Sequence, residues 1–267
     1  MSPKLTLSNI SRSYDGKPVL RDCSFSFDSD CIYLLMGPNG SGKSTFLRVC
    51  ALLEEPDKGE VNFVEDSTPL NPPLVRDTTP KSPPLVRGGF WGAVLKKDMN
   101  LRRRISLVLP KIGIFNTTVF KNVAYGLKIR GFKKKEIEEK AHKALEFVGL
   151  IHKKDLNALT LSSGEAQRLG IARALVIDPE MLFFDEPTAS LDPYSTAIIE
   201  EMIMKVKERS KITIIMVTHN IFQAKRLADR VLFMYEGRIV DDGLNKQFFE
   251  KPKDERAYMF ITGQMVY

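Results

Sequence analysis

The chain has 267 residues, with 40 lysines and arginines against 33 acidic residues, so its formal net charge is +7. A hydrophobic content of 43% and a charged content of 27% are those of an ordinary globular protein and exclude a disordered or fibrous chain. The most apolar stretches, residues 31–36 and 212–217, are far shorter than the roughly 18 residues that a membrane-spanning helix needs. We therefore expect one large or two small domains that do not cross a membrane.

The cysteines and the basic clusters indicate the cellular compartment and the kind of partner. The three cysteines show no metal-binding spacing, and the N-terminus lacks an apolar leader, which favours a reducing cytoplasm. The basic clusters are short (residues 96–97, 102–104 and 133–135), so we expect no nucleic-acid partner. The last cluster opens an amphipathic helical pattern and is interpreted as its solvated face, with weak attraction to anionic lipid as the alternative.

In chain order, residues 4–9 and 19–27 alternate between polar and apolar side chains and predict a small antiparallel β layer. Strands at residues 31–36, 181–185 and 212–217 are each followed by a helical pattern, beginning near Lys43, Pro193 and Asn220. Such strand-then-helix units predict a mostly parallel sheet covered by helices. A helical block is expected at about residues 117–148.

Residues 66–97 depart from this pattern. Six prolines fall between Pro69 and Pro84, and residues 68–76 are echoed eleven positions later by residues 79–87. This density of proline is incompatible with a central strand or a helix interior. We interpret the segment as an inserted surface loop, and the alternative is a docking motif for a proline-binding partner.

A phosphate-binding loop is predicted between the strand at 31–36 and the helix at Lys43, because the sequence matches G-x-x-x-x-G-K-[ST] in that context. Backbone N–H groups of such a loop surround phosphates, the lysine reaches the β- and γ-phosphates, and the following hydroxyl binds Mg²⁺. The predicted nucleotide-binding residues are Gly37, Pro38, Asn39, Gly40, Ser41, Gly42, Lys43, Ser44 and Thr45.

Two adjacent carboxylates, Asp185 and Glu186, end the strand at 181–185, at the sheet edge where ligands of α/β proteins bind. Asp185 together with Ser44 is the candidate Mg²⁺ ligand pair, and Glu186 is the candidate general base for water attack. The alternative, plain surface charge, is disfavoured by the phosphate loop in the same chain.

The segment Leu161-Ser162-Ser163-Gly164-Glu165 precedes an apolar helical pattern, so its amides and hydroxyls form either an anion cradle or a simple helix cap. With the motifs above, it makes the chain resemble the ATP-binding cassette (ABC) family, whose signature is L-S-G-G-[QE]. The resemblance runs in order along almost the whole chain. It implies a P-loop NTPase cassette: an α/β fold with a mostly parallel sheet, a small antiparallel β layer and a helical signature subdomain.

The resemblance assigns further roles by position. Tyr14 stands where the family has its adenine-stacking aromatic residue, with ordinary core packing as the alternative. His219 stands at the switch histidine that contacts the γ-phosphate, with a structural role as the alternative. Residues 190–192 match the segment that crosses between subunits. The signature residues that would cover ATP bound to a second copy are Ser162, Ser163, Gly164 and Glu165.

The resemblance also implies an organisation and a set of partners. Residues 4–245 are expected to form the ATP-binding domain, with a helical subdomain at about 111–165, the insertion at about 66–97 and a C-terminal tail at 246–267. The expected cofactors are ATP and Mg²⁺. The expected partners are a second cassette in a homodimer, transmembrane permease subunits and, through them, an extracytoplasmic solute-binding protein, at the cytoplasmic face of a prokaryotic plasma membrane.

Two positions depart from the family pattern. Ser163 replaces the first signature glycine, which keeps the backbone N–H and adds a hydroxyl. Pro110 follows the strand at 105–109 where the family has a glutamine that touches Mg²⁺ and relays the state of the transporter. Proline has neither a side-chain amide nor a backbone N–H, so coupling, rather than ATP binding, is the property at risk.

Residues 115–128 and 252–267 resemble the ATP-binding subunits of tungstate-type oxyanion importers. The expected function is therefore to couple ATP hydrolysis to uptake of a small oxyanion, tungstate first. One alternative is the ATPase of a phosphate or amino-acid importer. The other is an ATP-binding remnant with impaired coupling, against which the retained Lys43, Asp185, Glu186 and His219 argue.

Overall fold

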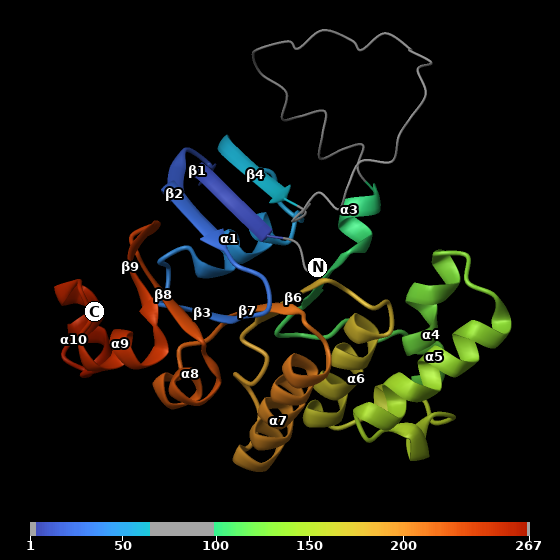
Figure 1. The fold of residues 1–267 in the computed structure, drawn as a ribbon. Coiled ribbons are helices and arrows are strands. Elements are labelled where there is room, and N and C mark those ends of the chain that lie inside the picture. The colour runs from blue at the N-terminus through green and yellow to red at the C-terminus, as the bar shows by residue number, and fades with distance from the viewer. Residues whose placement is uncertain (1–3, 65–98, 266–267) are drawn as a thin grey trace, which may run out of the picture.

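The computed structural model describes residues 4–64 and 99–265, and within them two β-sheets enclose a helix while further helices cover the outer face (Figure 1). The larger sheet has the strand order β5-β6-β7-β3-β8-β9 in this part of the chain. All neighbours in it are parallel except β8 and β9. Its strands are β3 (Ile32–Met36), β5 (Ile105–Val108), β6 (Met181–Asp185), β7 (Thr213–Val217), β8 (Arg230–Tyr235) and β9 (Arg238–Leu244).

The central strands are buried on both faces, which explains their continuous apolar runs. Along β3, Ile32, Leu34 and Met36 point into the core beneath the outer helices. Tyr33 and Leu35 alternate with them and point into a second core beneath the smaller sheet. The carboxyl ends of β3, β6 and β7 therefore meet at one sheet edge, fixed by two fully packed layers.

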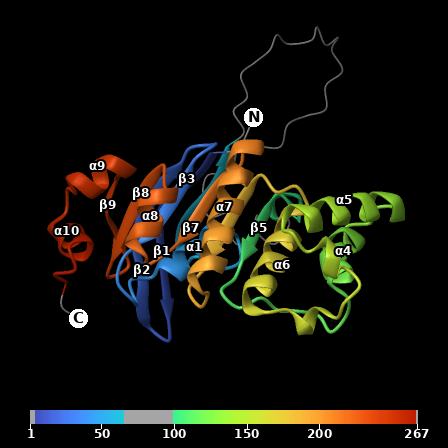
Figure 2. The same cartoon turned by 90° about the horizontal axis from the view of Figure 1, so that it is seen from below.

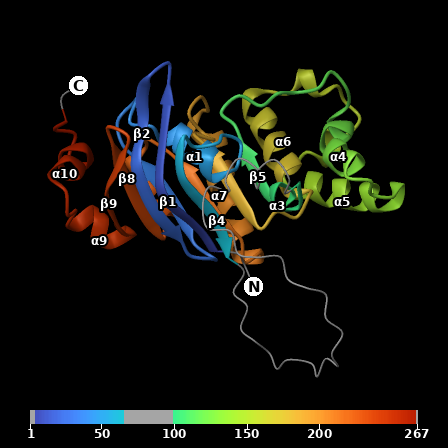
Figure 3. The same cartoon turned by 90° about the horizontal axis from the view of Figure 1, so that it is seen from above.

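The smaller sheet is antiparallel and contains β1 (Lys4–Tyr14), β2 (Lys17–Phe27) and β4 (Lys58–Val64) in the order β2-β1-β4 among the described residues. Strand β1 continues beyond the predicted end at Asn9, where a φ of 54° and a register shift interrupt the polar–apolar alternation. Helix α1 (Lys43–Cys50) lies between the two sheets (Figure 3), and its Phe46, Leu47 and Val49 are buried.

The outer helices lie on different sides of the large sheet. Helices α6 (Ser163–Leu175), α7 (Pro193–Arg209) and α8 (Ile221–Leu227) lie over the face of the large sheet opposite α1 (Figure 2). Helices α4 (Val119–Ile129) and α5 (Lys134–Phe147) extend to one side, and α9 (Asn245–Glu250) and α10 (Glu255–Ile261) lie at the opposite edge. The remaining short elements are α3 (Met99–Arg103), η1 (Ile151–Lys153) and η2 (Ala158–Thr160).

This architecture confirms the predicted α/β class with a mostly parallel sheet and an antiparallel β layer. The predicted helical block contains two helices, separated at Gly131, whose φ of 81° favours glycine. The basic cluster 133–135 opens α5 on its exposed side, while Ala141, Ala144 and Leu145 are buried. No helix of the described residues is long and apolar enough to span a bilayer. The proline-rich repeat at 66–97 lies outside the described residues.

Candidate functional site

The loop between β3 and α1 requires glycine at its two ends. Gly37 has a φ of 141°, and a Cβ there would lie 2.0 Å from the carbonyl oxygen of Met234. Gly42 has a φ of 96°, and its Cβ would lie 2.8 Å from the carbonyl oxygen of Val19. The loop is thus held close against neighbouring backbone, in a conformation that other residues adopt only with strain.

Three features of this loop fit a phosphate group. The Ser41 hydroxyl is buried and has no hydrogen-bond partner among the described residues. Helix α1 begins without a side-chain cap, so its first N–H groups are available at the positive end of the helix dipole. An added Cβ at Gly40 would meet nothing within 4 Å, so the loop is open on that side. Together these features make an anion cradle.

Lys43 crosses the loop. Its Nζ donates hydrogen bonds to the carbonyl oxygens of Gly37 (2.8 Å) and Pro38 (2.7 Å). Burial lowers the pKa of Lys43, and the carboxylates of Glu186 and Asp185 oppose that shift. The ammonium group is thus already placed over the cradle, where phosphate oxygens would replace loop carbonyls as its acceptors.

The structure brings the two predicted Mg²⁺ ligands together. The Ser44 hydroxyl donates a hydrogen bond of 2.9 Å to Asp185 Oδ1, although the residues are far apart in sequence. Burial raises the pKa of Asp185, and the Ser44 hydrogen bond works against that shift. The described residues contain no cluster of three or more acidic, His or Cys ligands. One hydroxyl and one carboxylate, completed by water and phosphate oxygens, are a donor set that suits Mg²⁺.

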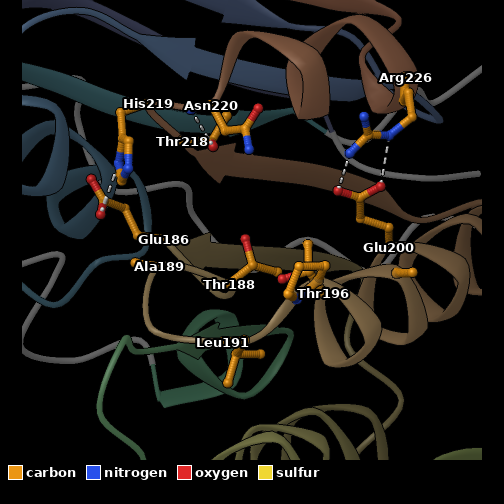
Figure 4. A pocket seen from close by; sticks show the side chains of 12 residues that line it. Glu186, Thr188, Ala189, Leu191, Thr196, Glu200, Thr218, His219, Asn220 and Arg226 are labelled. Atoms are coloured by element: carbon orange, nitrogen blue, oxygen red, sulfur yellow. Dashed lines mark hydrogen bonds and ion pairs between the residues drawn. The ribbon is translucent and has the colours of Figure 1, made fainter.

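Glu186 and His219 face one another beside this pair (Figure 4). His219 Nδ1 lies 3.3 Å from Glu186 Oε2. Glu186 follows β6 with a φ of 46°, a left-handed conformation unusual for glutamate, and its backbone N–H donates to the carbonyl oxygen of Val217. Strain of this kind is often found at functional sites. Both side chains remain accessible, with exposed fractions of 26% for Glu186 and 58% for His219.

Tyr14, the candidate adenine platform, ends β1 and is 38% exposed. Its hydroxyl donates to the Glu54 carboxylate, and the Arg12 guanidinium lies 5.0 Å from the ring centroid. Arg12 is held in turn by Asp57 at 2.6 Å. The Tyr14 side chain is therefore fixed by polar neighbours at the surface rather than packed in the core, so the core-packing alternative is wrong.

The signature segment caps helix α6. The Ser162 hydroxyl accepts from the backbone N–H of Glu165, and the Ser162 N–H donates to the Glu165 carboxylate at 3.1 Å. That carboxylate also accepts from Lys153 Nζ at 2.6 Å, which lowers the pKa of Glu165. The hydrogen bonds of Ser162 and Glu165 thus run within the helical side of the chain and not to the phosphate loop. Ser162 and Ser163 are exposed and Gly164 is buried.

Gly164 is buried because the signature packs on the start of α7. A Cβ at Gly164 would lie 2.6 Å from Ser195 Oγ. Both the N–H and the hydroxyl of Ser195 donate to Asp192, the last residue of the predicted crossing segment. Ser195 therefore lies against Gly164 of the signature and is hydrogen-bonded to Asp192 of the crossing segment.

Sequence reasoning missed several side chains that hold these residues. Arg12 carries a weak signal, because it stands two positions before Tyr14 on the same strand. Lys153 carries none, since it meets Glu165 only through the fold. A cavity of about 500 Å³ beside Glu186 and His219 was also missed, and Glu200 and Arg226 lie at its far end (Figure 4).

Comparison with known proteins places these features in a family. The ABC transporter family model matches residues 20–189, which include the phosphate loop, the signature and Asp185-Glu186. The phosphate import ATP-binding protein PstB 2 of Natronomonas pharaonis is 35% identical over 272 residues, which cover 98% of this chain and 88% of that protein. A probable anion import ATP-binding protein of Haloferax volcanii is 32% identical, covering 99% of this chain and 88% of that protein.

A probable amino-acid ABC transporter ATP-binding protein of Haemophilus influenzae is 35% identical over 96% of this chain and 94% of its own length. The solved structure of cbiO1 from Clostridium perfringens, described as part of the ABC transporter complex cbiONQ, superimposes with a TM-score of 0.76 at 28% identity. That superposition covers 94% of this chain and 92% of cbiO1. By its motifs, its fold and these similarities, the chain belongs to the ABC transporter family, as an ABC-type ATPase subunit.

Proposed function

We propose that this chain is the ATP-hydrolysing subunit of an importer for a small oxyanion, with tungstate as the first anion to test. One observation carries the proposal: a single sheet edge joins Lys43 over the phosphate cradle, Ser44 bonded to Asp185, and Glu186 beside His219. For the substrate, support comes from the resemblance of residues 115–128 and 252–267 to tungstate-type subunits. Two of the similar proteins are also named for phosphate or anion import.

Each residue has a defined part in hydrolysis. Gly37 to Thr45 bind the phosphates through backbone N–H groups, and Lys43 supplies the neutralising charge. Glu186 accepts a proton from the attacking water, and His219, 3.3 Å away, orients that water and the γ-phosphate. Ser44 and Asp185 would hold Mg²⁺, which neutralises charge on the phosphates when bound. Tyr14 stacks on adenine, and the Arg12 guanidinium lies against the tyrosine ring.

The site is completed by a second copy of the chain. Ser162 and Ser163 are exposed at the N-terminus of α6, where N–H groups and the helix dipole favour an anion. Their hydrogen bonds do not reach the phosphate loop of the same chain. In a head-to-tail homodimer, the signature of each copy covers the ATP held by the other, so that two ATP molecules lie at the interface.

A permease subunit contacts the side of the fold formed by β5, α4 and α6. A groove of about 280 Å³ lies there, lined by apolar side chains that include Ile112 and Ile129 and by the cationic Arg130 and Arg173. Exposed aromatic rings, Phe115 and Tyr125, stand beside it with centroids 4.8 Å apart. This partner places the chain at the cytoplasmic face of a prokaryotic plasma membrane, and through the permease it responds to a solute-binding protein.

The direct test is ATP hydrolysis by the full chain with Mg²⁺, compared with Glu186→Gln. We expect Glu186→Gln to lower the rate by about 10²- to 10⁴-fold, since it removes the base, while ATP still binds. Lys43→Ala should instead weaken nucleotide binding itself. Equal rates for Glu186→Gln and the parent chain would remove Glu186 from the mechanism. A parent chain that binds ATP and never hydrolyses it would support the remnant alternative.

The substrate is tested on the native complex. The chain is purified with its permease, and ATPase stimulation by the loaded binding protein is compared for tungstate, molybdate, phosphate and amino acids. Stimulation by tungstate at the lowest concentration supports the proposal. Stimulation by amino acids alone supports the second candidate function, which the similarity to the Haemophilus influenzae protein favours.

A further inference from the structure

Gln223 is a buried polar residue that the proposed mechanism does not use. It lies in the first turn of α8, four residues after His219, and none of its surface is exposed. A buried amide destabilises a fold unless its donors and acceptor are paired, so its partners indicate what it does. Two of its side-chain partners, Thr218 and Thr188, stand next to the candidate catalytic residues in the chain, and a third, Glu200, lies on α7.

The amide joins the two loops that carry Glu186 and His219. Gln223 Oε1 accepts a 2.7 Å hydrogen bond from the hydroxyl of Thr218, the residue directly before His219. Gln223 Nε2 donates a 3.0 Å hydrogen bond to the hydroxyl of Thr188, two residues after Glu186. Through one rigid planar group, the loop after β6 and the loop after β7 are held at a fixed separation.

The orientation of this amide is determined by charge. Nε2 also donates a 3.1 Å hydrogen bond to Glu200 Oε1, and a carboxylate can only accept. Glu200 is itself fixed by two hydrogen bonds from the Arg226 guanidinium, of 2.9 Å and 2.7 Å. The side chain at position 223 must therefore donate on one side and accept on the other, which leucine and glutamate of similar size cannot do.

We infer that Gln223 is a positioning residue for ATP hydrolysis, which sets the separation of Glu186 and His219 by bridging Thr188 and Thr218. The inference rests on the proposed function, because it needs those two residues to act together. Glu186 sits in a strained left-handed conformation, and such backbone persists only where its surroundings over-determine it. The bridge to Thr188 supplies one such constraint from outside the loop, on the wall of the cavity in Figure 4.

Thr188 offers the mildest test, because Thr188→Val removes only the hydroxyl and Thr188→Ser keeps it. We expect Thr188→Val to lower kcat for ATP hydrolysis about tenfold with the KM for ATP within about twofold, since a displaced catalytic group affects the chemical step rather than binding. Thr188→Ser should remain within about threefold of the parent chain. An equal loss in both variants, or none in either, would overturn the inference.

Gln223 is tested by a charge exchange. Gln223→Glu places a second carboxylate against Glu200 in a buried site, and we expect kcat to fall at least about tenfold. Adding Glu200→Gln restores one donor and one carboxylate across the contact, so the double variant should recover activity relative to Gln223→Glu. Gln247→Glu, at an exposed glutamine on α9, is the matched control and should behave as the parent chain. A double variant no more active than Gln223→Glu would contradict the bridge.

These experiments distinguish a failure of the proposed ATPase function from a failure of the positioning role of Gln223. If the parent chain hydrolyses no ATP, the proposed function fails whatever the variants do. If the parent chain is active, and Gln223→Glu and Thr188→Val melt with it and hydrolyse ATP at its rate, only the positioning role is wrong. A fall in ATP affinity that accounts for the whole loss of rate would likewise refute it, because the bridge does not touch the phosphate cradle.

Discussion

Replacing Gly164 with alanine tests how the signature segment is seated on the rest of the fold. The new Cβ would lie 2.6 Å from Ser195 Oγ and 3.0 Å from Ser195 Cβ, so one of the two residues must move. If Ser195 rotates away, its hydroxyl loses the 2.6 Å hydrogen bond to Asp192. If the helices separate instead, the contact between α6 and α7 is strained.

The cost follows from these two routes. A lost hydrogen bond to an exposed carboxylate costs about 1 kcal/mol, and overpacking costs about 1–3 kcal/mol. We therefore expect Gly164→Ala to lower the free energy of unfolding by about 1–3 kcal/mol and the melting temperature by about 2–10 °C. The assay is thermal and urea unfolding of the full chain, with Gly113→Ala as the control, because a Cβ at Gly113 meets nothing within 4 Å.

A compensating variant makes the prediction specific to this contact. Ser195→Gly removes both atoms that the new Cβ would meet, so it destabilises the chain alone but relieves Gly164→Ala. The double variant should be more stable than the sum of the single effects by about 1–2 kcal/mol. Strict additivity, or a Gly164→Ala protein that melts with the parent chain, would refute the close packing of the signature on α7.

Three further predictions concern single side chains. Lys153→Met should destabilise the chain by about 1–2 kcal/mol at pH 7, because it removes the charged hydrogen-bond donor to the Glu165 carboxylate and leaves the Ser162 N–H bonded to it. The pKa of Glu165 is lowered in the folded state, so this stabilisation is present above the ordinary glutamate range and is lost as the pH falls through the lowered pKa. The difference in melting temperature between the parent chain and Lys153→Met should therefore shrink in acid and must not grow. Tyr14→Ala should weaken ATP binding about tenfold by calorimetry through lost base stacking, whereas Tyr258→Ala, at an exposed tyrosine on α10, should not. Pro110→Gln should raise the anion-stimulated ATPase activity of the assembled transporter more than it changes the ATP affinity of the chain. Equal anion stimulation of the parent and Pro110→Gln transporters would mean that this complex does not use a glutamine at position 110.

The parts of the fold that the sequence predicts are those with strong local patterns. The strands that form the centre of the large sheet are continuous apolar runs, and the observed β3 and β7 begin within one residue of the predicted bounds. The phosphate loop and the Asp185-Glu186 pair could be placed at one edge because parallel strands end together. The Ser44–Asp185 hydrogen bond then agrees with the prediction that these two residues share a site.

Other elements lack such a signal. Strand β4, Lys58–Val64, mixes charged and apolar residues and is recognisable only once it pairs with β1. The hairpin of β8 and β9 turns at Glu236 and Gly237, both at positive φ, and was not predicted, nor were α9 and α10. The predicted strand ends at Asn9, short of the observed end of β1 at Tyr14, because Asn9 breaks the polar–apolar alternation by which a strand is predicted from sequence.

The supporting contacts of the site could not be predicted from the sequence. Gln223 meets Thr188 because α8 packs against the loop after β6, and Gly164 meets Ser195 because α6 packs against α7. No periodicity or motif encodes such pairs, since they depend on the tertiary arrangement of whole elements. Motifs therefore predict which groups do the chemistry, whereas the structure identifies the groups that hold them in place.

The central claim is that the signature of one copy completes the ATP site of another. The most direct test measures the molecular mass of the Glu186→Gln protein in ATP and Mg²⁺, by light scattering during gel filtration. Because hydrolysis is blocked, ATP should hold two chains together at about twice the 30.2 kDa of one chain. Adding Ser163→Glu, which places a negative charge at the exposed start of α6, should return the chain to a monomer that still binds ATP. A Glu186→Gln chain that stays monomeric at saturating ATP, or a dimer indifferent to Ser163→Glu, would contradict the account.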